Sequence, residues 1–235
     1  MKQKRNCGLF LVLLATIACA GCKTVSSVSK NQQGVQKFTQ TRYEEAIRLF
    51  QESINLDHTN ADAHYNLASA YHKLGLLHHD RIQLQLAESH YNSCLDYSDD
   101  NHPECYKGLV NLLDQTGRFD DAVQLLEHWR GRYPTSIEPN IQLAYLYDTA
   151  NQHQTALNHL LQAYSLDRNN SRVLAALGFL RERQGYTDQA IMNYRQSLDI
   201  NREQPEVSAR LAALETRQTY GQYGGNVAPG PTVMR

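Results

Sequence analysis

The chain has 235 residues, of which 6 are proline, and its formal net charge is −1 at pH 7. Lys2, Lys4 and Arg5 stand in the first 21 residues, which contain no acid, so the remaining chain has 20 basic and 24 acidic residues. This balance gives no general attraction for a phosphate backbone or an anionic lipid surface. The composition therefore argues against nucleic-acid binding, and scarce proline with abundant Leu, Ala and Gln favours helices.

Residues 1–21 are predicted to be a signal peptide. A cationic start is followed by an apolar stretch over residues 8–20, which is too short for a permanent membrane helix but typical of a secretory signal. The run Cys19-Ala20-Gly21-Cys22 resembles the lipobox of bacterial lipoproteins, although the usual first residue, Leu, is replaced by Cys19. The resemblance implies cleavage before Cys22 and acylation of its thiol. The alternative is ordinary secretion without a lipid.

A lipid at Cys22 implies a particular location for the mature chain. Three acyl chains exceed the two signals that stable anchoring requires, and residues 22–30 are predicted to be a lipid-linked tether. Lys23 after the acylated cysteine favours the outer membrane over the inner membrane by the sorting rule of enterobacterial lipoproteins. We therefore expect a membrane-anchored lipoprotein that faces the periplasm.

Several residue types recur along the chain with a period of 34 residues. In successive repeats, the period separates leucines of the first helix, glycine or asparagine residues at the turn, alanines near the start of the second helix, and larger residues four positions after these alanines. These sets are Leu109, Leu143, Leu177 and Leu211; Gly117, Asn151 and Gly185; Ala122, Ala156 and Ala190; and Leu126, Leu160 and Tyr194. A 34-residue period with two helical segments per unit resembles that of tetratricopeptide repeat (TPR) proteins.

The resemblance implies an all-α fold, a right-handed TPR superhelix of about five helix-turn-helix repeats with a C-terminal capping helix. The solenoid is predicted over residues 31–218 and a disordered tail, rich in Gly and Pro, over residues 219–235. The predicted units are 27–60, 61–102, 103–136, 137–170 and 171–204, with the cap at 205–218.

The second unit is longer than the others. Gly75 and Ala87 are 12 positions apart, whereas Gly117 and Ala122 are 5 apart, so about seven residues are inserted near 76–83. We expect the insertion to be a solvated loop around His78-His79-Asp80, because histidines adjacent in sequence cannot both face one metal ion on a helix. The sequence therefore predicts no metal site and no cofactor.

TPR proteins usually bind peptides or partner domains in a concave groove lined by the first helix of each pair. Mapping this face onto the chain gives Tyr65, His72, Lys73, Lys107, Asn111, Ile141, Tyr145, Asp148, Phe179 and Arg183. Tyr145 and Phe179 are of most interest, because aromatic rings in a groove suit the anchoring of a partner. The alternative is that one or both rings pack into the core between units.

Cys94 and Cys105 are the thiols that remain once the signal peptide is removed and Cys22 is acylated. They lie on the two arms of a predicted helix pair, so a disulfide is possible in an oxidising periplasm. The alternative is a pair of buried thiols that pack as small hydrophobic groups.

Function follows from these predictions by exclusion and by resemblance. The sequence has no nucleophile elbow, phosphate-binding loop or zinc-protease helix, so we do not expect an enzyme. We expect a protein-binding scaffold of the cell envelope, with a protein or peptide in the groove, the membrane at the lipid, and neither nucleic acid nor a small-molecule substrate. The chain is also similar to TPR lipoproteins of type IV or tight-adherence pilus assembly, so one alternative is a pilotin-like role in pilus or secretion-system assembly. Another is an adaptor for cell-wall enzymes or proteases.

Overall fold

The computed structural model describes residues 24–98 and 102–224, with side chains to residue 219. Over these residues the chain consists of helices and short connections without a strand, which confirms the predicted all-α class. The predicted signal peptide, the lipidation site Cys22 and most of the predicted tail lie outside the described residues. Within the described ranges, no helix is both long and apolar enough to cross a bilayer.

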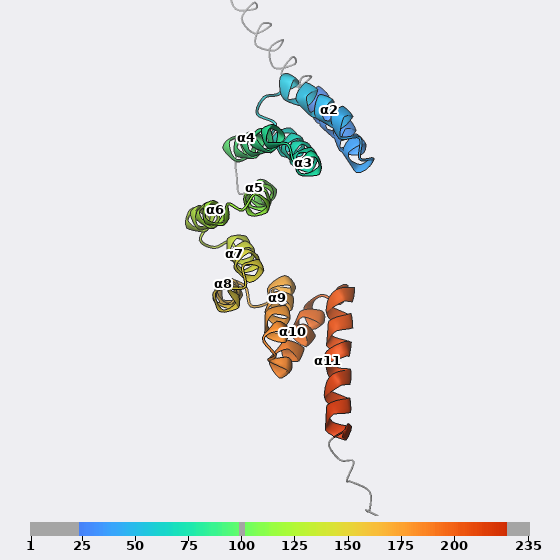
Figure 1. Cartoon of the computed structure of the whole chain (residues 1–235), viewed down its shortest axis with the longest axis vertical. Coiled ribbons are helices and arrows are strands. Elements are labelled where there is room, and N and C mark those ends of the chain that lie inside the picture. Colours follow the sequence, from blue (N-terminus) through green and yellow to red (C-terminus); the bar gives the residue numbers. More distant parts are fainter. Residues whose placement is uncertain (1–23, 99–101, 225–235) are drawn as a thin grey trace, which may run out of the picture. The chain divides into compact units, whose positions relative to one another are not determined.

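The chain divides into two compact units, with the boundary after Leu125 inside α6. Unit 1 contains a helix over residues 24–39, followed by α2 (Tyr43–Leu56), α3 (Ala61–His78), α4 (Arg81–Tyr97), α5 (Pro103–Gln115) and the first half of α6 (Phe119–Arg132). Unit 2 contains the rest of α6, then α7 (Glu138–Thr149), α8 (His153–Leu166), α9 (Ser171–Arg183), α10 (Thr187–Ile200) and α11 (Pro205–Gly224). Inside each unit, helices that follow one another in sequence form hairpins (Figure 1).

Every helix pair turns through one residue with a positive φ angle. The residue that follows it donates its backbone N–H to the carbonyl five positions earlier, at 2.8–3.0 Å, which satisfies an end carbonyl of the first helix. Glycine adopts this conformation without strain, and asparagine is the next most tolerant residue. The turn residues are Thr41, His79, Gly117, Asn151 and Gly185, with φ angles of 60°, 53°, 75°, 60° and 80°.

The second helix of each pair supplies a buried seam with a fixed spacing. An alanine near its start is fully buried, a large side chain four positions later is almost fully buried, and so is the residue three positions further on. These sets are Ala46, Ala87, Ala122, Ala156 and Ala190; Phe50, Tyr91, Leu126, Leu160 and Tyr194; and Ser53, Cys94, Trp129, Ala163 and Ser197. The repeated spacing places all three residues on one helical face. Trp129 is therefore a core residue, as its position in the repeat predicts.

The inserted residues of the second unit are helical, so the predicted loop is wrong. α3 continues to His78 and α4 begins at Arg81, and only His79 and Asp80 connect them. His79 takes the positive φ angle, and the Asp80 carboxylate accepts the N–H of Ile82 at 2.8 Å as a helix cap.

Gly75, which the sequence pattern aligns with the turn glycines, lies inside α3. A Cβ atom at this position would stand 2.8 Å from the Leu84 side chain, so glycine here permits close approach of α3 and α4. Both arms of this hairpin are longer than those of the next one. Leu67 and His79 are 12 positions apart, whereas Leu109 and Gly117 are 8 positions apart. His79 and Ala87 are 8 positions apart, whereas Gly117 and Ala122 are 5 positions apart. The insertion therefore adds about one helical turn to each arm.

Both ends of the predicted solenoid differ from the structure. Residues 24–30 form the start of a helix rather than a tether, because Ser27 is buried and bonds Ser53: its hydroxyl lies 2.9 Å from the Ser53 hydroxyl, which also donates to the Ser27 carbonyl at 2.8 Å. α11 continues to Gly224, beyond the predicted end at residue 218. Leu214 on this helix packs against Ala190 and Tyr194, which closes the core of unit 2.

Candidate partner-binding site

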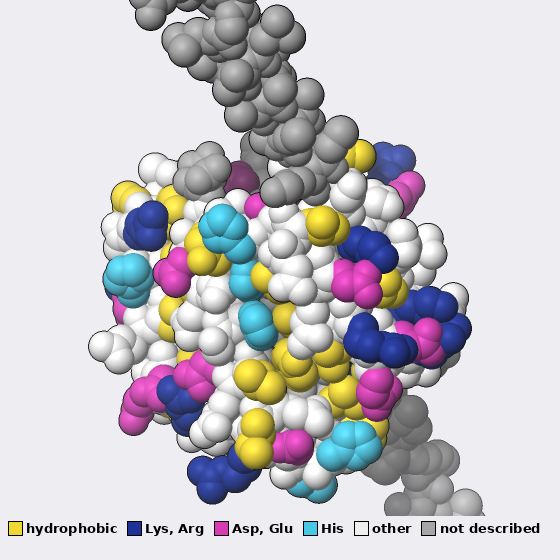
Figure 2. Space-filling model, turned by 90° about the horizontal axis from the view of Figure 1, so that it is seen from above, with side chains coloured by type: hydrophobic (Ala, Val, Ile, Leu, Met, Phe, Trp, Pro, Cys, Tyr) yellow, Lys and Arg dark blue, Asp and Glu magenta, His cyan; other side chains and the backbone are white. Residues whose placement is uncertain are grey.

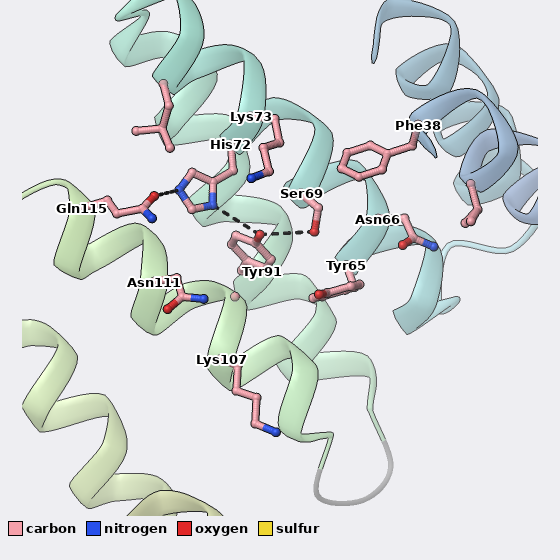
Figure 3. Close-up of a pocket in the computed structure, with 13 residues that line it drawn as sticks. Phe38, Tyr65, Asn66, Ser69, His72, Lys73, Tyr91, Lys107, Asn111 and Gln115 are labelled. Carbon is pink, nitrogen blue, oxygen red and sulfur yellow. Dashed lines mark hydrogen bonds between the residues drawn. The ribbon is translucent and has the colours of Figure 1, made fainter. Parts of the chain in front are cut away.

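The first helices of unit 1 surround a cavity of about 330 Å³ (Figure 3). We call it the unit-1 groove. α3 and α5 supply most of its lining, the helix over residues 24–39 forms one side, and Tyr91 of α4 closes the floor. Its lining comprises Val35, Phe38, Tyr65, Asn66, Ser69, His72, Lys73, Leu76, Tyr91, Lys107, Gly108, Asn111 and Gln115.

A chain of hydrogen bonds fixes the floor of the unit-1 groove. His72 Nε2 lies 3.0 Å from the side-chain oxygen of Gln115, and its Nδ1 lies 3.5 Å from the Tyr91 hydroxyl. The Tyr91 oxygen in turn lies 3.3 Å from the Ser69 hydroxyl (Figure 3). The tautomer with the proton on Nε2 satisfies this chain, because an amide oxygen only accepts hydrogen bonds. Burial lowers the pKa of His72 and raises the pKa of Tyr91 to about 12, so both groups favour their neutral forms.

The charge of the lining has one sign. Lys73 and Lys107 come from α3 and α5, while Asn66, Asn111 and Gln115 add neutral amide groups (Figure 3). None of the described residues that line the groove is acidic. By contrast, cationic and anionic side chains lie next to one another over the face drawn in Figure 2. The groove therefore suits a ligand that carries carboxylate and amide groups.

The structure brings the five predicted groove residues of this unit together. Tyr65, Lys73, Lys107 and Asn111 have exposed or partly exposed side chains, whereas His72 is buried. His72 lines the groove but offers little surface to a partner, because both ring nitrogens are used within the protein. Its role is to hold the floor of the groove.

The predicted groove residues begin at Tyr65 and do not include the side of the groove that lies before residue 40. Val35 and Phe38 line the cavity, but they belong to a helix that was predicted to be partly a tether. The spacing of Gly34 indicates this helix in the sequence. Gly34 stands 16 positions before Phe50, just as Gly178 stands 16 positions before Tyr194. In both pairs a Cβ atom on the glycine would lie less than 2.7 Å from the ring, so each pair marks two packed helices.

In unit 2, two of the predicted groove residues have internal roles. Asp148 is buried and bonds His153 Nδ1 at 2.7 Å and the guanidinium of Arg183. Ile141 is partly buried and packs against the core that contains Leu177. Asp148 therefore offers little to a partner, because its carboxylate already pairs with two side chains, one of which is the predicted groove residue Arg183.

The two aromatic candidates of unit 2 differ from one another. The side chain of Tyr145 is 59% exposed and is therefore available to a partner. Phe179 is partly buried, and the guanidinium carbons of Arg183 and Arg210 lie 5.8 and 4.7 Å from its ring centroid. Cation–π contacts thus hold this ring in place, which leaves Tyr145 as the exposed aromatic candidate.

The structure joins Cys94 and Cys105 in a disulfide. Their Cα atoms are 6.0 Å apart, within the range that a disulfide spans, and both side chains are buried. The bond links α4 to α5 within unit 1, on the second and third predicted repeats.

Comparison with family models agrees with the spacing of the helices. A model described as "TPR repeat" matches residues 37–75, and one described as "Tetratricopeptide repeat" matches residues 137–170 and 171–204. These units are tetratricopeptide repeats. The two later matches have the bounds that the 34-residue period predicts.

Several proteins of known identity or structure are similar to this chain. Anaphase-promoting complex subunit 6 of Dictyostelium discoideum is 26% identical over 173 residues, which are 72% of this chain but only 19% of that protein, so the chain spans about a fifth of its length. The structure of a thermophilic TPR protein, TTC0263 of Thermus thermophilus, matches with a TM-score of 0.59 and 20% identity, over 81% of this chain and 99% of that chain. The structure of Pseudomonas aeruginosa pilF matches with a TM-score of 0.58 and 19% identity, over 89% of this chain and 95% of that chain.

At these identities the structural matches establish the fold. Tetratricopeptide repeats stack helix pairs and so present extended surfaces that bind protein or peptide partners. The chain is therefore a protein-interaction scaffold, and the unit-1 groove is a candidate binding surface.

Proposed function

We propose that the chain is a non-catalytic scaffold of the bacterial cell envelope that binds an extended segment of a partner protein in the unit-1 groove. The observation that carries the proposal is the lining of this groove, in which the described residues include two lysines, three amide side chains and no acid. The lipobox-like run ending at Cys22 supports membrane attachment on the periplasmic side, with the outer membrane favoured by Lys23.

The chemistry of the groove indicates which segment it would accept. Amide side chains can pair with the backbone of an extended peptide, and lysine ammonium groups can pair with its carboxylates. The ring of Phe38 and the side chain of Val35 offer an apolar wall for one of its side chains. We therefore propose a partner segment that is extended, carries at least one carboxylate near the lysines and places an apolar residue against this wall.

One alternative is a role in the assembly of a pilus or a secretion system. The match to the pilF structure supports it, since that match extends over nearly the whole of both chains. The lipobox-like run adds the expectation of a lipoprotein. Loss of pili in a deletion strain would favour this alternative, whereas altered cell-wall lysis would favour an adaptor for cell-wall enzymes or proteases.

The groove is tested by photo-crosslinking in cells. A photoreactive phenylalanine analogue replaces Tyr65 inside the groove or, as control, the exposed Gln124 on α6 of the same unit. We expect a discrete crosslinked product from position 65 and none of that product from position 124. Equal labelling from the two positions would show that the partner does not bind in the unit-1 groove.

The charge of the groove is tested in the same strain. Lys73→Glu should reduce the yield of the crosslinked product at position 65 roughly 5- to 30-fold, which corresponds to about 1–2 kcal/mol of lost attraction. Arg168→Glu makes the same charge change at an exposed loop position of unit 2 and should leave the yield unchanged. An equal loss in both variants would show that the net charge of the chain, and not the groove, governs the interaction.

A further inference from the structure

A second cluster of reactive side chains lies in unit 1 outside the groove lining. Cys94 at the end of α4, Cys105 in α5 and His102 just before α5 bring two sulfur atoms and a ring nitrogen within 4.8 Å of one another. Both cysteine side chains are fully buried. α4 and α5 follow one another in the chain (Figure 1), and His102 lies in the connection between them.

The hydrogen bonding of His102 determines which of its nitrogens is free. Nε2 lies 3.3 Å from a carboxylate oxygen of Asp62, which only accepts, so the ring proton belongs on Nε2. Nδ1 is buried and makes no hydrogen bond, although a carboxylate oxygen of Glu104 lies 3.3 Å away. In this tautomer Nδ1 carries a lone pair. A carboxylate that orients the far nitrogen of an imidazole is the usual arrangement around metal-binding histidines.

We propose that the reduced chain binds one thiophilic divalent cation, of which Zn²⁺ is the type, through Cys94, Cys105 and His102 Nδ1. Two thiolates and one imidazole form a donor set that suits tetrahedral Zn²⁺, and water or the nearby Glu104 carboxylate can provide the fourth ligand. Asp62 acts as a positioning residue through the imidazole.

The same sulfur atoms cannot form a disulfide and bind the cation together. Reduction transfers two electrons and two protons from a dithiol to the Cys94–Cys105 bond, and the dithiol itself becomes a disulfide. Binding of the cation then displaces the two thiol protons. The site is therefore open to metal only in the reduced chain and closed in the oxidised chain.

Cobalt(II) titration of the full chain tests the proposal. Cys7, Cys19 and Cys22 are replaced by serine to remove the other thiols, and the chain is reduced with a phosphine in metal-free buffer. We expect one Co²⁺ per chain, with thiolate-to-cobalt charge-transfer absorption in the near ultraviolet and displacement by Zn²⁺. The oxidised chain should show no such absorption, and its appearance there would overturn the proposal.

Variants separate the proposed ligands from adventitious binding. His102→Ala should weaken binding at least tenfold and Asp62→Asn about tenfold, and Cys94→Ser should roughly halve the charge-transfer absorption because one of the two thiolates is lost. His78→Ala removes an exposed histidine outside the cluster and should change nothing. Circular dichroism shows that each variant is folded before it is titrated, and His102→Gln replaces any alanine variant that is not. Unchanged affinity in folded His102 variants, or a band of unchanged intensity in Cys94→Ser, would refute the site.

Discussion

His64 and His90 form a close pair between α3 and α4. Their Nδ1 atoms are 3.2 Å apart, and the ring of His90 stacks on that of Tyr71 with centroids 6.0 Å apart. Desolvation lowers the pKa of both histidines, and desolvation together with the neighbouring His64 imidazole brings the pKa of His90 to about 4. Only one proton can lie between the two Nδ1 atoms, so protonation of both rings at once is unfavourable.

This pair makes stability depend on pH in a defined direction. At pH 7 His90 is neutral in both folded and unfolded chains, but below about 6.5 the unfolded chain binds the proton more readily. The free energy of unfolding should therefore fall as the pH is lowered from about 6.5 towards 4. His90→Gln should remove about 1–2 kcal/mol of this fall, since His90 keeps partial contact with solvent.

Urea unfolding followed by circular dichroism at pH 7 and pH 4.5 measures this change. The control is His78→Gln, an exposed histidine at the end of the same α3 that carries His64. We expect it to retain the full pH dependence of the unmodified chain. A His90→Gln chain with that same pH dependence would contradict the assignment to the His64–His90 pair.

At the scale of residues, the sequence predicts position better than role. His72 and Asp148 stand on the predicted helix faces, yet each is bound by neighbours from other helices: His72 by Tyr91 and Gln115, Asp148 by His153 and Arg183. A helical period shows which face a residue occupies, but not which side chains meet it there. Those partners depend on three-dimensional packing.

At the scale of elements, the small residues of the first helices control how closely the pairs pack. Gly178 in α9 lies against Tyr194 of α10, where a Cβ atom would stand 2.6 Å from the ring. The ring cannot easily move, because Tyr194 is buried and its hydroxyl donates to Glu182 at 2.7 Å. Gly178→Ala should therefore lower the free energy of unfolding by about 1–3 kcal/mol.

Gly131 in α6 provides a matched control, because nothing lies within 4 Å of the Cβ that alanine would add. Gly131→Ala should stabilise the chain by up to about 1 kcal/mol through helix propensity alone. Thermal unfolding measures both, with shifts of about 2–4 °C per kcal/mol for a chain of this size. Equal shifts of the same sign would show that propensity, rather than contact with Tyr194, dominates at Gly178.

The elements that the sequence predicts best are those that the 34-residue period repeats without interruption. Gly117, Asn151 and Gly185 all form the turns that their spacing predicts. The period fails where the local sequence departs from it, at the insertion and at the two ends. There, contacts such as Ser27 with Ser53 decide whether a segment is helical, and the 34-residue period carries no signal for them.

At the scale of the whole molecule, the fold is predictable because each repeat contacts mainly its neighbours, so the same pattern of core residues recurs from one repeat to the next. The binding surface is less predictable, since it arises from residues that differ between repeats, such as Lys73 and Lys107. The proposed attachment to a membrane would depend on one atom, the Cys22 sulfur.

Cys22→Ala should therefore move the protein from the membrane fraction to the soluble periplasmic fraction and abolish incorporation of labelled palmitate. The physical reason is that the acyl chains of the proposed lipoprotein would supply the apolar area that holds it at the bilayer. Cys19→Leu, which restores the usual first lipobox residue, should leave both measurements unchanged. Palmitate incorporation that persists in Cys22→Ala would exclude the proposed anchor.

The lengthened hairpin of α3 and α4 shows how this chain can tolerate insertions. One turn added to each arm returns every later side chain to its original face, so Ala87 and Tyr91 remain in the seam. Removing residues 76–82 would place Gly75 five positions before Ala87, the separation of Gly117 and Ala122. The shortened hairpin would then have the ordinary length, with Gly75 at the position of the turn residue.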